Sequence, residues 1–187
     1  MQFDRSRLDQ LATSRLEHVL IALRDGDRAY NIRDVLDPWW CFERGPPFVA
    51  ARRDGGYTDI QFNKPCAWEW RDVLGKFDGI SSGAARIRDL GEEARIVDRK
   101  DHPKDLSLIV EHSVPLSVIS KQLWTEPHLW TVERLAQFLR RTFRRSVISY
   151  ADDDLLRKKK LSSRMPDGWR FGGDPFARYH EAGTRLV

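Results

Sequence analysis

Glu111 and His112 stand side by side at the end of an apolar run, Leu106 to Val110. A neutral histidine, with an unperturbed pKa of about 6.5, can take a proton from water close to neutral pH. A carboxylate is one of the oxygen ligands that a hard divalent cation such as Mg²⁺ prefers. The pair therefore has the residue types that phosphodiester hydrolysis needs, namely a base and a ligand for the cation that stabilises the developing charge.

The apolar run before this pair predicts a buried strand over Leu106 to Glu111. Side chains alternate across a regular strand, so two adjacent residues point to opposite faces. Both can reach one substrate only if the strand ends or bends between them. Pro115 lies close behind the pair and is consistent with such a bend.

The elements that must complete the site follow in order. A helix is expected from Leu116 to Leu123, and a second begins at Thr131 and runs through Phe143. The β-branched segment Ser146 to Tyr150 predicts another strand, and Ala151 to Lys158 predicts a helix with acids in its first turn. The order is therefore strand, helical excursion, strand and helix.

Residues from about 105 to 165 resemble the HNH, or ββα-metal, nuclease family. The resemblance is carried by the strand, by Glu111-His112-Ser113-Val114-Pro115, and by the later strand and helix. It implies that His112 is the general base and that Glu111 is a metal ligand. It places the second ligand early in the last helix, where Asp154 falls closest and Asp153 is the neighbouring candidate. The family usually has Asn or His there, so an Asp is a departure. The implied cofactor is Mg²⁺, with Mn²⁺ as the alternative.

Positive charge is concentrated in the same half of the chain. The net charge of all 187 residues is +4. The segment 134–164 alone contains ten Lys or Arg residues and three Asp residues. Such a concentration beside a phosphodiester site favours contacts to a nucleic-acid backbone, although it is also typical of a solvated helix surface. The expected nucleic-acid-binding residues are Arg140, Arg141, Arg144, Arg145, Arg157 and Lys158.

The first part of the chain matches no pattern with an evident role. A helix is expected over Arg7 to Arg24, ended by Asp25-Gly26-Asp27. The aromatic stretch Trp39 to Trp70 reads as rich in strands, with a hairpin turn at 52–56. We expect an α+β fold in two regions. Residues 1–104 form a mixed α/β region of unknown role, and residues 105–187 form a ββα-metal nuclease unit with a helical insertion and a C-terminal tail.

The amino-acid composition indicates the class of protein and its expected location. A chain that is 41% hydrophobic can bury a core. No stretch approaches the ~20 apolar residues of a membrane helix, and no apolar segment follows the N-terminus. Two cysteines, Cys41 and Cys66, form no CxxC pair. We expect a cytoplasmic protein with no membrane partner.

The resulting expectation is a metal-dependent HNH-type endonuclease that hydrolyses DNA, by analogy in restriction or phage defence. Two alternatives stay open. The chain can be a non-catalytic nucleic-acid-binding subunit, or a protein-interaction module that binds its partner through the aromatic N-terminal region. Metal-dependent cleavage, salt-sensitive binding without cleavage, and partner binding without DNA affinity distinguish the three.

Overall fold

The computed structural model describes residues 3–60, 73–90, 95–96 and 104–187. These residues form an α+β fold. They divide into two compact units, one of residues 1–60 with 120–140 and the other of residues 61–119 with 141–187. This division does not follow the expected boundary at residue 104, because each unit is built from two separate stretches of the chain.

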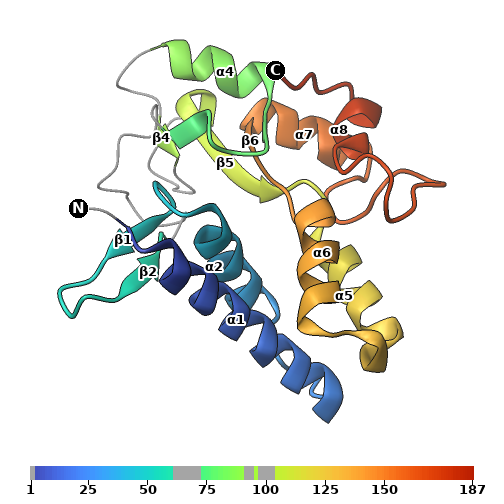
Figure 1. Cartoon of the computed structure of the whole chain (residues 1–187). Coiled ribbons are helices and arrows are strands. Elements are labelled where there is room, and N and C mark those ends of the chain that lie inside the picture. Colours follow the sequence, from blue (N-terminus) through green and yellow to red (C-terminus); the bar gives the residue numbers. More distant parts are fainter. Residues whose placement is uncertain (1–2, 61–72, 91–94, 97–103) are drawn as a thin grey trace. The chain divides into compact units, whose positions relative to one another are not determined.

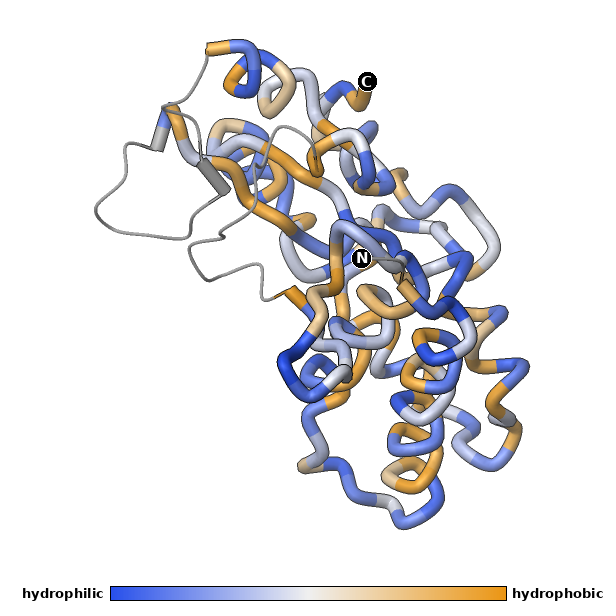
Figure 2. The backbone as a smooth tube through the Cα atoms, turned by 60° about the vertical axis from the view of Figure 1, so that its left-hand side comes forward, coloured by the Kyte–Doolittle hydropathy of each residue, from blue (hydrophilic) through white to orange (hydrophobic). Residues whose placement is uncertain are grey.

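The first unit contains a pair of helices, α1 (Arg5–Asp25) and α2 (Arg33–Arg44) (Figure 1). Asp4 caps α1 by accepting a hydrogen bond from the Arg7 amide, and Gly26 ends it in the left-handed conformation with φ of +69°. The expected helix and its stop are therefore confirmed. Hydrophobic and hydrophilic residues alternate every few positions along the helices, as expected where one side is buried (Figure 2).

The expectation of strand from Trp39 onward is wrong for the first six residues, which belong to α2. Aromatic residues favour strands only weakly, and packing decides their conformation. Trp39, Trp40 and Phe42 are each at most 3% exposed. The helix continues through Pro38. The expected hairpin is present as β1 (Val49–Ala51) and β2 (Tyr57–Asp59), which pair antiparallel. The stretch from 61 to 70 lies outside the described residues.

The second unit contains a four-stranded sheet in the order β3-β6-β5-β4. Its members are β3 (Gly79–Ile80), β4 (Arg95–Ile96), β5 (Ser107–His112) and β6 (Arg145–Ser149). The central strands β5 and β6 pair antiparallel, and each of the other two pairs parallel with its neighbour. The two strands expected from the sequence are thus confirmed as the centre of the sheet.

Helices connect these strands, and residues 120–140 of the connection between β5 and β6 belong to the first unit. The excursion between β5 and β6 holds α5 (Leu116–Thr125), the short 3₁₀ turn η2 (Pro127–Leu129) and α6 (Val132–Thr142), and another 3₁₀ turn, η1 (Lys104–Leu106), precedes β5. Thr131 caps α6 as expected. The remaining helices are α4 (Ser82–Asp89), α7 (Tyr150–Lys158) and α8 (Ala177–Ala182).

One core of the second unit joins β6 to the last two helices. Ile148, Leu156, Leu161, Tyr179 and Ala182 are all buried there, with Ile109 of β5 packed against them. The segment after α7 therefore folds back on the same face of the sheet as α8 (Figure 1). Among the described residues, no helix combines the length and the apolar character needed to cross a membrane.

Candidate functional site

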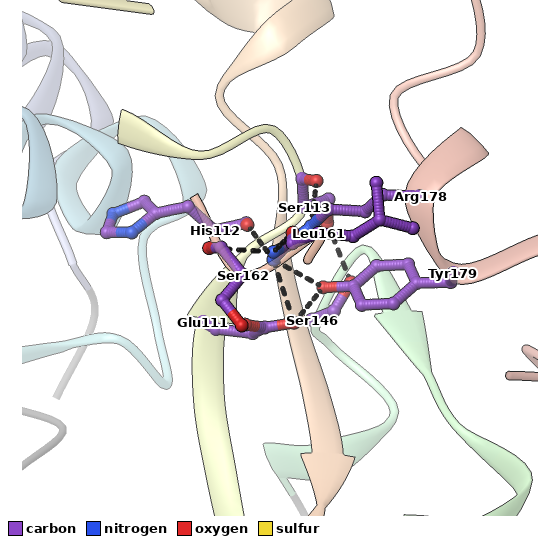
Figure 3. A network of polar contacts seen from close by, with 8 residues as sticks. All are labelled: Glu111, His112, Ser113, Ser146, Leu161, Ser162, Arg178 and Tyr179. Carbon is purple, nitrogen blue, oxygen red and sulfur yellow. Dashed lines mark hydrogen bonds and ion pairs between the residues drawn. The ribbon is translucent and has the colours of Figure 1, made fainter. Parts of the chain in front are cut away.

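The strand that carries Glu111 and His112 stays regular to its last residue. Glu111 pairs with Ser146, and His112 pairs with Arg145. Because adjacent side chains of a regular strand point to opposite faces, the two side chains diverge. Figure 3 shows the His112 ring turned away from the residues around Glu111. The expected bend between them is wrong, because the strand ends only after His112.

The antiparallel register also decides where α7 begins. Ser149, which precedes α7, pairs with Leu108 near the start of β5. His112 pairs with Arg145, at the other end of β6. The first residue of α7 therefore lies at the opposite end of β5 from the Glu-His pair.

His112 is only 9% exposed, and Arg145 and Phe143 are among its neighbours. Its Nε2 lies 3.0 Å from Nη1 of Arg145, and its ring meets the Phe143 ring edge-on at 4.9 Å between centroids. A guanidinium has only donors, so Nε2 accepts this hydrogen bond. In this arrangement the acceptor nitrogen that a general base needs is already used.

Glu111 points to the other face of β5 and meets two residues from α8. Its Oε1 accepts a hydrogen bond of 2.6 Å from the Tyr179 hydroxyl and lies 2.8 Å from Nη2 of Arg178 (Figure 3). The Glu111 side chain is 18% exposed, and that of Arg178 is 1% exposed. The carboxylate is therefore paired with a buried cation of the same chain.

Arg178 connects three segments that are distant in the sequence. Its guanidinium donates to the carbonyl oxygens of His112 at 2.6 Å and Ser113 at 2.8 Å. It also donates to those of Leu161 at 3.0 Å and Ser162 at 3.2 Å. The end of β5, the segment after α7 and α8 are thus tied together by one side chain.

Sequence reasoning missed Arg178 and Tyr179. They lie 66 and 68 residues from the main-chain and side-chain partners they bind at His112 and Glu111. The segment around them is rich in aromatic and turn residues, such as Trp169, Pro175 and Phe176, which favours packing but indicates no particular partner.

A buried polar chain extends from Glu111 across the sheet. Burial, followed by the charge of Glu111, raises the pKa of the Tyr179 hydroxyl. A side-chain hydrogen bond links Tyr179 to Ser146, and the Ser146 and Ser113 hydroxyls lie 2.7 Å apart. Each polar side chain of this hydrogen-bonded network therefore has a partner, as buried polar groups require.

The acids at the start of α7 have separate roles. Asp152, which was not among the expected ligands, is 7% exposed and accepts hydrogen bonds from the hydroxyls of Ser149 and Ser81. It forms a capping box for α7. Asp153 and Asp154 each lie 2.8 Å from Nη2 of Arg157.

These side chains do not assemble a site that fits a divalent cation. Among the described residues, no three His, Cys, Asp or Glu side chains gather closely enough to hold a metal. A dication at the Glu111 oxygen that faces Arg178 would meet a guanidinium charge in a largely buried setting, where like charges repel strongly. Asp154 is paired with Arg157 instead.

The expected nucleic-acid-binding residues differ in accessibility. In the first unit, Arg140 forms a bidentate pair with Glu43. In the second unit, Arg144 pairs with Asp78, whose side chain is 4% exposed, and Arg145 is itself 2% exposed. Burial removes Arg145 from a binding surface. Four of the six residues are exposed: Arg140, Arg141, Arg157 and Lys158.

The protonation of Glu111 gives a testable pH dependence. Burial raises the pKa of its carboxyl above the ordinary value of 4.5, against the opposing charge of Arg178 and the hydrogen bonds from Tyr179 and Arg178, and the charge of Asp153 raises it further. A pKa raised by folding means that the folded state holds the proton more tightly. The resulting stability is present at low pH and is lost as the pH rises through the folded pKa.

We therefore expect the free energy of unfolding of the wild type, relative to that of Glu111→Gln, to fall as the pH rises above 4.5. Urea denaturation at a series of pH values measures this difference. A difference that grows with pH would show that Arg178 outweighs burial.

A comparison with protein-family models, curated proteins and solved structures gives no match.

Proposed function

We propose that this chain binds nucleic acid without hydrolysing it, through a basic segment at the end of α7. The observation that carries the proposal is the exposure of every cation in this segment. The basic segment consists of Arg157, Lys158, Lys159, Lys160 and Arg164, all exposed. No acidic residue occurs between 155 and 166.

The backbone of the basic segment is held in place. Leu161, in its middle, is 2% exposed, and Arg178 binds the carbonyl oxygens of Leu161 and Ser162. The Ser117 hydroxyl donates to the Ser163 carbonyl oxygen at 3.0 Å, and Arg164 Nε donates to that of Lys160 at 2.8 Å. An ordered backbone reduces the entropy lost on binding, which favours a phosphate-binding role over that of a merely solvated helix end.

Contacts of this kind position a nucleic acid and carry no direct sequence information. Lys158, Lys159 and Lys160 form no ion pair among the residues that the structure describes. Their ammonium groups are therefore available to replace counterions on a phosphate backbone.

The first experiment is a salt titration of binding. We expect the full-length protein to bind a fluorescent 20-base-pair DNA duplex with an affinity that falls roughly 10²–10³-fold between 50 and 200 mM salt, as for four to five phosphate contacts. Fluorescence anisotropy measures the dissociation constants. Binding that is absent at 50 mM salt, or that does not depend on salt, would refute the proposal.

Hydrolysis of DNA is the second candidate, and one observation favours it. The order β5, β6, α7 is that of the nuclease unit which the sequence resembles, with Glu111-His112 at the end of its first strand. We therefore keep a one-metal HNH mechanism with His112 as base as an alternative that requires rearrangement around Glu111.

A cleavage assay decides between the candidates. Supercoiled plasmid is incubated with the wild type and with His112→Ala in 5–10 mM Mg²⁺ or Mn²⁺. The binding proposal predicts no cleavage by either protein. Cleavage by the wild type that His112→Ala reduces about 10²-fold or more, the scale of general-base catalysis, would establish hydrolysis. An equal residual cleavage by both would indicate a contaminant.

A further inference from the structure

The positive charge beside the Glu111 carboxylate comes from an arginine side chain of the same protein. The resemblance to metal nucleases places a divalent ion at Glu111. The structure instead places the Arg178 guanidinium 2.8 Å from Oε1, with 1% of its side chain exposed. The Tyr179 hydroxyl donates to the same oxygen at 2.6 Å. The charge that a metal would neutralise is thus already neutralised.

The surroundings are shaped for a guanidinium. Arg178 donates from all three of its side-chain nitrogens. Its acceptors include the four carbonyl oxygens of residues 112, 113, 161 and 162, the Glu111 carboxylate and the Tyr179 hydroxyl. Such a planar fork of donors matches acceptors spread around it, whereas an ammonium has one compact donor centre. A hard divalent cation requires tighter coordination, at about 2.0–2.1 Å for Mg²⁺, with several waters retained.

We propose that the Arg178 guanidinium takes the place of the divalent ion beside Glu111. The same side chain holds together the end of β5, the segment after α7 and α8. Two consequences follow. The wild type binds no divalent cation through Glu111. Removal of the Arg178 side chain opens a buried site that accepts a free guanidinium ion in preference to an ammonium or a magnesium ion.

The test is chemical rescue of Arg178→Ala. Its melting temperature is measured with methylguanidinium, methylammonium or Mg²⁺ at matched ionic strength. We expect methylguanidinium at about ten times its dissociation constant to raise the melting temperature by about 3–5 °C. Neither of the other cations should do so. The wild type and the double variant Glu111→Gln/Arg178→Ala serve as controls and should show no rise. Equal rescue by the three cations, or no rescue of a folded variant, would overturn the proposal.

A second measurement uses the wild type, in case Arg178→Ala does not fold. Binding of Mn²⁺ is followed by electron paramagnetic resonance for the wild type and for Glu111→Gln. We expect identical titrations, because Glu111 is already paired. Stoichiometric Mn²⁺ binding by the wild type that is lost in Glu111→Gln would overturn the proposal. Since neither measurement involves nucleic acid, their outcome is independent of the binding function.

Discussion

Replacement of Arg178 by methionine is expected to lower the free energy of unfolding by about 3–5 kcal/mol, the range for breaking a buried ion pair. The substitution preserves much of the aliphatic side chain but removes the charge that neutralises Glu111. It also leaves the carbonyl oxygens of His112 and Ser113 without the donors that Arg178 provides. Because a domain has only about 5–15 kcal/mol of stability, this single change is expected to remove a large share of it.

Urea denaturation followed by circular dichroism measures the effect. Arg170→Met is the matched control, because Arg170 lies in the same tail and is exposed, and it should change stability by less than about 0.5 kcal/mol. Tyr179→Phe removes the hydrogen bond to the Glu111 carboxylate together with the link to Ser146, and it should cost at least about 1.5 kcal/mol. The double variant Glu111→Gln/Arg178→Met should be about 1–2 kcal/mol more stable than Arg178→Met alone, because it contains no buried unpaired carboxylate. An Arg178→Met protein as stable as Arg170→Met would contradict the role of Arg178.

Reversal of three charges in the basic segment should have the largest effect on nucleic-acid binding. In the variant Lys158→Glu/Lys159→Glu/Lys160→Glu, we expect the affinity for duplex DNA at 0.1 M salt to fall at least about tenfold. The slope of log affinity against log salt should decrease by about three, one for each lost phosphate contact. All three side chains are exposed, so the fold should be retained. Circular dichroism confirms the fold, and anisotropy measures binding.

The matched control reverses three exposed cations of the first unit, in the variant Arg24→Glu/Arg53→Glu/Lys121→Glu. It changes the net charge by the same amount. If both variants lose affinity equally, binding follows net charge and the basic segment has no special part. A specific loss in the Lys158–160 variant supports the proposed surface.

Local sequence signals predicted most elements around the candidate site because those signals act over a few residues. The cap at Thr131 and the acids at the start of α7 have local hydrogen-bonding or electrostatic causes. The apolar runs of β5 and β6 are visible because both strands are largely buried. The prediction of a strand failed at Trp39–Arg44, because these residues, three of them aromatic, belong to α2.

The sequence by itself determined the order strand, helical excursion, strand and helix, and the concentration of positive charge beside it. Only the tertiary structure decided which way the Glu111 and His112 side chains point and which groups they contact. The regular pairing of β5 with β6 turned the two side chains to opposite faces. The return of the chain in α8 then brought a buried arginine to Glu111, while Arg145 approached His112 from the neighbouring strand. Glu111 and His112 point to opposite faces because side-chain direction depends on strand register. Arg178 lies beside Glu111 because the burial of charged groups depends on long-range packing.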